Sequence, residues 1–156
     1  MTFVVKAPAA PARGAEKPGT GQATEPVREL QLRGRVVCLP EEMHRRHGAP
    51  LPTNHGHIWG FRAEDGQFYT LLRSKFSEAI FLDERLREKE LSLKVRLFPK
   101  SSVIEVLTIH SVRLGVVQDL FYYCDLCAIK AVSPEPCACC QGPMELVEQP
   151  LSKRDE

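Results

Sequence analysis

Several features are missing from this 156-residue sequence, and each absence excludes a class of protein. No stretch approaches the roughly 20 consecutive apolar residues of a membrane-spanning helix. Lys and Arg (21) almost balance Asp and Glu (20), so the net charge of +1 gives no overall attraction to nucleic acid or anionic membranes. Phosphate-cradling glycine loops, nucleophile–base pairs and paired catalytic carboxylates cannot be recognised. We therefore predict a soluble, non-enzymatic protein, unless an unrecognised metal centre supplies chemistry.

The two ends of the chain lack the pattern of a folded core. Residues 1–27 consist mainly of Ala, Pro, Gly and isolated charges, which predicts a disordered tail. The apolar run Phe3-Val-Val5 is too short for the core of a secretory signal, so we predict a cytoplasmic location, where thiols stay reduced. Residues 151–156 form a short charged tail. Over the whole chain, 43% of the residues are hydrophobic and 26% are charged, which is typical of a globular protein.

The middle of the chain, residues 28–118, predicts a mainly β domain. Strand-like runs are separated by turns, and Asp65-Gly66 is a typical hairpin signal. Leu91–Leu97 alternates strictly between apolar and polar side chains, as a half-buried strand does. The predicted strands are 30–40, 57–62, 67–72, 91–97 and 103–112, with one short helix within 76–90. This order favours a five-stranded OB-like Greek-key barrel with a helix between its third and fourth strands.

Three segments of this region also resemble a group of bacterial OB-like domains. They are Gly34-Arg-Val-Val37, the hairpin from Gly60 to Leu72 and Ile104-Glu-Val106. The resemblance spans about 80 residues and implies the barrel, but it implies no defined reaction.

Five of the six cysteines fall within residues 124–140 and suggest a metal site. Cys124 and Cys127 form one Cys-x-x-Cys pair, and Cys137 and Cys140 form another after nine intervening residues. Two such turns can direct four thiolates at one tetrahedral ion, which is the ligand arrangement of a zinc ribbon. We therefore predict that residues 119–150 are a zinc ribbon whose four cysteines bind a structural Zn²⁺. Four thiolates leave no open coordination position for catalysis.

Alternatives to this site remain open at the level of sequence. The cysteines could form disulfides in an exported protein, or one pair could be a redox dithiol. Cys139 lies between Cys137 and Cys140 and is a possible substitute ligand. Cys38 fits a buried strand residue better than a remote ligand.

The cysteine region also resembles the small heavy-metal-binding domain found beside copper-transporting ATPases and efflux adaptors. The matching residues are Tyr123, Cys124, Cys137, Cys140, Met144 and Leu146. Cys127 stands where that family has His, Leu126 replaces its first Met, and Asp125 replaces a Pro. The resemblance implies soft-metal binding, while the added thiolate and the lost methionine favour zinc over copper.

Four of the five histidines lie between the first two predicted strands, at His44, His47, His55 and His57. His44 and His47 would share one side of a helical turn, and His55 and His57 would add two donors at strand spacing. A second, histidine-based metal site is one interpretation. The favoured interpretation is that these histidines are solvated loop residues beside Arg45 and Arg46.

Aromatic and basic residues on the predicted hairpin suggest a possible nucleic-acid surface. Trp59, Phe61, Phe68 and Tyr69 could stack on bases, with Arg62, Arg73 and Lys75 near phosphates. Strand alternation would send some of these rings into the barrel core, which is the favoured interpretation. Phe121-Tyr-Tyr123 is predicted to pack the ribbon on the barrel, and Asp83 with Arg87 to form an exposed pair on the helix.

Together these patterns predict a zinc-binding adaptor with a protein partner. Single-stranded nucleic-acid binding and soft-metal (copper) sensing or transfer are the alternatives.

Overall fold

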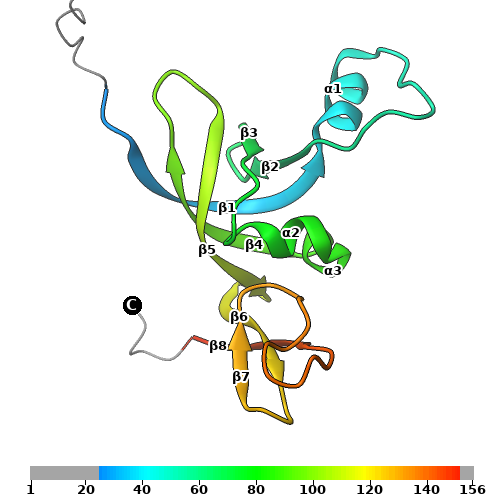
Figure 1. Ribbon diagram of the computed structural model, residues 1–156. Coiled ribbons are helices and arrows are strands. Elements are labelled where there is room, and N and C mark those ends of the chain that lie inside the picture. Colours follow the sequence, from blue (N-terminus) through cyan, green and yellow to red (C-terminus); the bar gives the residue numbers. More distant parts are fainter. Residues whose placement is uncertain (1–24, 152–156) are drawn as a thin grey trace, which may run out of the picture.

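The structure is a computed structural model that describes residues 25–151 (Figure 1). Most of the predicted N-terminal tail and all but Leu151 of the charged C-terminal tail therefore lie outside the described residues. The strands are β1 (Arg28–Cys38), β2 (Trp59–Ala63), β3 (Phe68–Leu71), β4 (Glu90–Leu97), β5 (Val103–Arg113), β6 (Val116–Cys124), β7 (Ile129–Ala131) and β8 (Glu145–Pro150). The helices are α1 (Leu39–His47), α2 (Glu78–Leu82) and α3 (Glu84–Arg87). The prediction of a mainly β protein is confirmed.

The first five strands form a ring. β1 pairs antiparallel with β2 on one side and with β4 on the other, β2 pairs with β3, and β4 pairs with β5. The ring closes where β3 meets β5 in parallel, with Thr70 opposite Val103 and Leu71 opposite Ile104. In Figure 1 the long, curved β1 wraps around one side of this ring.

The predicted hairpin between β2 and β3 is confirmed, and its turn depends on Asp65 and Gly66. Gly66 has a φ of 82°, a left-handed conformation that glycine adopts without steric cost. The carboxylate of Asp65 accepts a hydrogen bond from the Gln67 amide at 2.9 Å. These two features reverse the chain between Arg62 and Phe68, which face each other across the strands.

Gly34 allows β1 to pair with two strands at the same position. It lies opposite Ala63 of β2 and also opposite Leu91 of β4. A Cβ atom at this position would lie 2.0 Å from the Arg62 carbonyl oxygen. Only glycine therefore permits the close approach of β1 and β2 where the ring bends.

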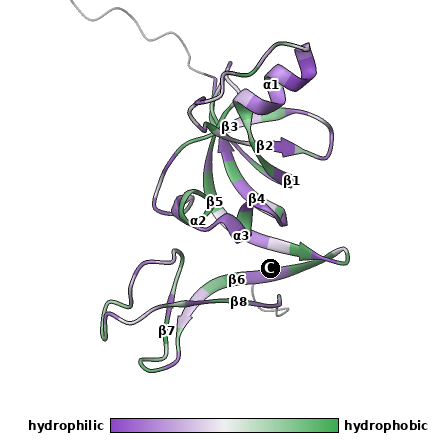
Figure 2. Cartoon of the chain, turned by 90° about the vertical axis from the view of Figure 1, so that its right-hand side faces the viewer, coloured by the Kyte–Doolittle hydropathy of each residue, from purple (hydrophilic) through white to green (hydrophobic). Residues whose placement is uncertain are grey.

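The core fills the inside of the ring and extends onto α2 and α3. Apolar residues recur at buried, alternate positions, at Leu91, Leu93 and Val95 on β4 and at Ile104 and Val106 on β5. In Figure 2 both strands carry hydrophobic and hydrophilic stretches. Fully buried side chains include Phe61, Ile80, Leu86, Leu91, Leu93, Val95, Ile104 and Val106. Ile80 of α2 and Leu86 of α3 belong to the same cluster as the strand residues, so the helices contribute directly to this core.

Two short helices replace the single helix expected within residues 76–90, and the prediction of an exposed pair between Asp83 and Arg87 is wrong. Asp83 has extended backbone angles (φ −109°, ψ 107°) that separate α2 from α3. Its carboxylate accepts a hydrogen bond from the Arg85 amide at 3.0 Å, which caps α3. Arg87 instead donates to the carbonyl oxygen of Ile80 at 2.9 Å.

The last three strands extend the sheet beyond the ring. β6 pairs with β5 near their connecting turn, with β8 along most of its length and with β7 at its end. Tyr122 of β6 is fully buried, and its hydroxyl donates to Asp83 Oδ2 at 2.8 Å. This contact agrees with the expected packing of residues 121–123 on the ring.

Among the described residues, no helix has the length and apolar character needed to cross a membrane.

Candidate metal centre

Two similar turns carry the paired cysteines. The first connects β6 to β7, so that Cys124 lies opposite Ile129 at the end of the ladder. The second follows residue 136 and is closed by a hydrogen bond from the Gln141 amide to the Cys137 carbonyl at 2.9 Å. In each turn the fourth residue after the first cysteine is left-handed, with φ of 53° at Ala128 and 58° at Gln141. Both Cys-x-x-Cys segments therefore end in the same reversal of the backbone.

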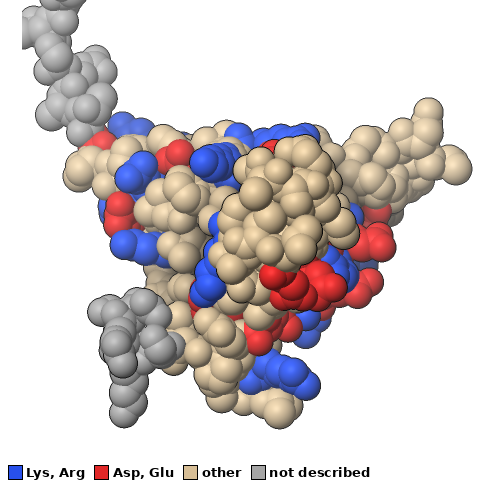
Figure 3. Space-filling model, turned by 60° about the horizontal axis from the view of Figure 1, so that its bottom comes forward, with Lys and Arg blue, Asp and Glu red and all other residues tan. Residues whose placement is uncertain are grey.

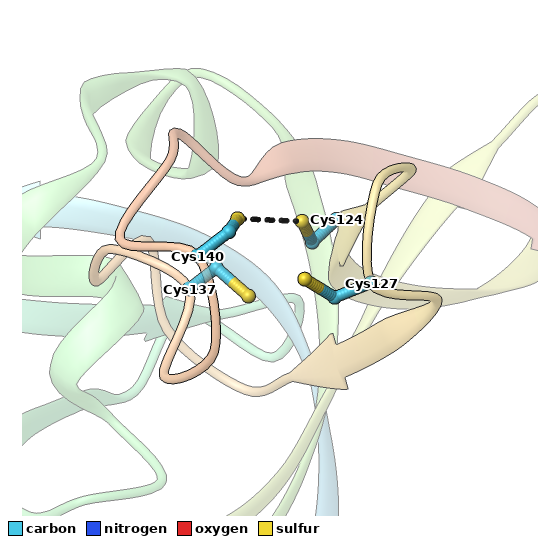
Figure 4. Close-up of side chains that lie close together, drawn as sticks. All are labelled: Cys124, Cys127, Cys137 and Cys140. Carbon is cyan, nitrogen blue, oxygen red and sulfur yellow. Dashed lines mark hydrogen bonds between the residues drawn. The ribbon is translucent and has the colours of Figure 1, made fainter.

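The turns bring four sulfur atoms together. The ligand atoms of Cys124, Cys127, Cys137 and Cys140 all lie within 4.8 Å of one another. The sulfur atoms of Cys124 and Cys140 lie 3.5 Å apart (Figure 4). Cys124 and Cys137 are buried, whereas Cys127 and Cys140 are partly exposed. A group of four thiols with this spacing could hold a metal ion.

The protonation of this cluster reflects the crowding of its thiols. Backbone N–H groups of Cys140 and Cys139 lower the pKa of Cys137 to about 7, because they donate to its thiolate. A hydrogen bond with Cys139, together with burial, raises the pKa of Cys127. Without a cation, four thiolates this close together would repel one another. A divalent cation would remove this repulsion and allow all four to ionise.

Disulfide bonds do not occur in the described part of the chain, which includes all six cysteines. Cys139, the possible substitute ligand, is exposed and lies outside the cluster of four. It is nevertheless adjacent in sequence to Cys140, a member of that cluster. Met144, which matches the heavy-metal domain, packs against the hydrophobic core.

The four histidines do not gather at one point. His47 is exposed on α1, and His44 Nδ1 is a buried atom without a hydrogen-bond partner among the described residues. His55 and His57 instead lie beside Cys38 and Glu41, and the ligand atoms of these four residues are also within 4.8 Å of one another. Sequence reasoning missed Glu41 here. The spacing Cys38-x-x-Glu41 across the start of a helix was the signal that could have indicated it.

The aromatic residues considered for base stacking are divided between the core and half-buried positions. Phe61 is fully buried, as the favoured interpretation expected. Trp59 and Tyr69 are partly buried against the core. The Arg46 guanidinium lies 4.5 Å from the centre of the Phe68 ring.

Two of the basic side chains considered with these rings are paired with carboxylates. Arg62 lies 3.4 Å from Glu42, and Arg73 binds Glu78 through two nitrogen atoms. On the face shown in Figure 3, Lys and Arg are interspersed with Asp and Glu. The charges therefore do not form a continuous basic surface on that face.

Comparisons with protein-family models, with curated proteins and with solved structures found no match.

Proposed function

We propose that this chain is a non-enzymatic interaction module in which an OB-type barrel carries a zinc ribbon. The ring of β1 to β5 supports the first part of the proposal. Its circular order, β1-β2-β3-β5-β4, its parallel contact between β3 and β5, and its helices between β3 and β4 are those of a five-stranded OB barrel.

The observation that supports zinc binding is the convergence of Cys124, Cys127, Cys137 and Cys140. Four thiolates match the preference of Zn²⁺ for tetrahedral sulfur ligands, and they leave no coordination position for substrate. The ion would be structural: it would hold together two turns that follow β6 and precede β8. Because these turns bury few apolar side chains, metal binding would supply much of their folding free energy.

A protein partner is supported by apolar side chains near the junction of the ring and the ribbon. A groove of about 250 Å³ is lined by residues of β5, β6 and the segments before α2 and after β7. Phe76 and Val132 on its walls are 47% and 44% exposed. Leu126, at the tip of the first cysteine turn, is 83% exposed. Such apolar surface is typical of a site that receives another protein.

Metal analysis of the purified chain tests the zinc ribbon. We expect one equivalent of zinc that resists a moderate chelator and is lost in Cys124→Ser and Cys137→Ser. Cys139→Ser is the matched control, since this exposed thiol lies outside the cluster and its loss should leave that zinc in place. A wild-type chain that folds fully without this zinc would contradict the proposal.

A paired affinity experiment tests the groove. Partners retained by the wild-type chain should be lost with the double variant Phe76→Asp and Val132→Asp. They should be kept by Leu114→Asp, which changes a 97% exposed leucine in the turn after β5. If the groove variant and the control retain the same proteins, the groove is not the binding surface.

Soft-metal transfer is a second candidate, and the position of Cys139 supports it. Its thiol is exposed and adjacent in sequence to Cys140 of the cluster, so it could accept Cu(I) from the cluster as a neighbouring soft ligand. Cu(I) should then displace zinc, and Cys139→Ser should slow the displacement. Retention of zinc against Cu(I) would exclude transfer.

Single-stranded nucleic-acid binding has weaker support. Arg62 and Arg73, two of the side chains considered for phosphate contacts, are paired with Glu42 and Glu78. Arg46 and Arg87 lie over the rings of Phe68 and Trp59, which leaves those ring faces covered. Binding of an oligonucleotide that weakens with salt and with Trp59→Ala would favour it.

A further inference from the structure

We propose that Cys38, Glu41, His55 and His57 form a second metal site, separate from the cysteine cluster. The site would bind a divalent ion of the zinc class through one thiolate, one carboxylate and two imidazoles. It does not depend on the zinc ribbon, since its ligands come from β1, α1 and the loop between α1 and β2.

The chain brings these four residues together at the end of β1. Cys38 is the last residue of that strand and is buried, and Glu41 lies in the first turn of the helix that follows at once. The loop of residues 48–58 then returns to this point, where the Leu39 amide donates to the Ile58 carbonyl at 2.9 Å. His55 and His57 belong to the returning part of the loop, so their rings are carried to Cys38 and Glu41.

The distances between ligand atoms agree with those around a single ion. His57 Nδ1 lies 3.4 Å from Cys38 Sγ and 3.8 Å from Glu41 Oε1. His55 Nε2 lies 3.0 Å from the same Glu41 oxygen. Ligands at the usual zinc distances in a tetrahedron are separated by about 3.3–3.8 Å. Small movements of side chains would therefore place all four donors around one ion.

The contacts of both ring nitrogens of His55 match those of a metal-binding histidine. Its Nδ1 lies 3.2 Å from the Pro52 carbonyl oxygen, and its Nε2 faces the Glu41 carboxylate. A neutral imidazole has one N–H and can donate to only one of these two acceptors. With a metal ion, Nδ1–H donates to the carbonyl and the Nε2 lone pair binds the ion, which is the usual arrangement for a metal-binding histidine.

The ring of His57 is also oriented by its neighbours. It stacks on Trp59, with ring centres 5.1 Å apart and planes inclined by 2°. The ring of His55 meets it edge to face at 5.0 Å. These contacts limit the rotation of the two rings and direct their nitrogen atoms to the same place.

The charge and exposure of the site distinguish it from the ribbon. One thiolate and one carboxylate balance a divalent ion, whereas four thiolates would leave two negative charges. The side chains of Glu41 and His57 are 51% and 54% exposed, so water and chelators can reach the ligands. We therefore expect an exchangeable ion that fastens the loop of residues 48–58 to β1 and α1.

Titration of the folded, ribbon-loaded chain with Zn²⁺ tests the site. The wild-type chain should take up a second equivalent, and the double variant His55→Ala and His57→Ala should not. Glu41→Gln should lower the affinity by more than about 100-fold, since even partners outside the coordination sphere contribute about 10–100-fold. His47→Ala is the matched control, because this exposed histidine lies outside the cluster.

Titration with Co²⁺ gives a second measurement, because a bound thiolate adds a charge-transfer band to the spectrum. The band from this site should be present in the wild type and absent in Cys38→Ser, while ribbon zinc remains. Hydrogen exchange in residues 48–58 should slow when the ion binds. Absence of a second equivalent, or its retention without both histidines, would overturn the proposal and leave a metal-free ion pair of His55 with Glu41.

Discussion

Replacing Tyr122 by Phe removes one hydroxyl group from the centre of the molecule and should destabilise it measurably. This hydroxyl donates to Asp83 Oδ2 at 2.8 Å, and both side chains are buried. The phenylalanine ring fills the same space, so the variant isolates the hydrogen bond from the packing.

The geometry around Asp83 sets the size of the effect. A hydrogen bond to a charged group contributes about 1.5–3 kcal/mol. Arg85 still binds both carboxylate oxygens in the variant, with Nε 2.9 Å from Oδ1 and Nη2 2.6 Å from Oδ2. Because Asp83 keeps these partners, we expect a loss of about 1–2 kcal/mol. For a protein of this size the melting temperature should fall by about 3–6 °C.

Thermal and urea unfolding of the metal-loaded chain would measure this loss. Tyr123→Phe is the matched control, since Tyr123 is half-buried and its hydroxyl has no hydrogen-bond partner among the described residues. A cycle with Asp83→Asn should give a coupling energy of about 0.5–3 kcal/mol. Equal stability of the Tyr122→Phe and Tyr123→Phe variants, or an additive cycle, would refute the reasoning.

Further predictions concern the ring, the cysteine turns and pH. Gly34→Ala should unfold the ring or lower the free energy of unfolding by more than about 3 kcal/mol, because the new Cβ would meet the Arg62 carbonyl oxygen. Unfolding followed by circular dichroism measures this loss. Gly56→Ala is the control and should change the stability little, because the space around Gly56 is open. Gln141→Gly should raise the stability of the metal-loaded chain by up to about 1 kcal/mol, because glycine adopts the left-handed conformation at this position without steric cost. A lower stability of the variant would show that the glutamine side chain is needed. A hydrogen bond from Arg85, with a further one from Tyr122, lowers the pKa of Asp83, so its stabilising contribution is complete above about pH 4 and lost as the pH falls through the lowered pKa. The stability difference between wild type and Asp83→Asn should therefore shrink in acid, and a constant difference would contradict this. Removal of zinc should loosen β7 and the second cysteine turn in hydrogen exchange, while amides of β4 stay protected.

Individual strands could be predicted from the sequence because each is specified by residues within the strand or in the adjoining turn. The alternation from Leu91 to Leu97 and the Asp65-Gly66 turn each specify a short segment, and both appear in the structure. The cysteine spacing is local in the same sense, since each Cys-x-x-Cys turn forms within five residues. The contacts that join these segments to one another involve residues far apart in the sequence.

Features that depend on distant partners were harder to predict. Asp83 is buried rather than exposed, and its carboxylate accepts a hydrogen bond from Tyr122, which is 39 residues away. The pairing of β6 with β8 adds β8 to the sheet, and nothing near either strand specifies that partner. Glu41 was overlooked because its role depends on a loop that returns more than ten residues later.

The closure of the ring by β3 and β5 has a consequence for the order in which the protein is built. Every strand of the ring precedes residue 114, whereas the four cysteines of the cluster lie between residues 124 and 140. During synthesis, long-range pairings such as β1 with β4 can therefore form before any of these four cysteines has left the ribosome. Until Tyr122 emerges, Asp83 lacks one of its buried partners, and the newly made ring has an uncovered edge at β5. The segment with the four cysteines is then added to a template that already exists, and under the proposed function metal capture would be the last step of folding.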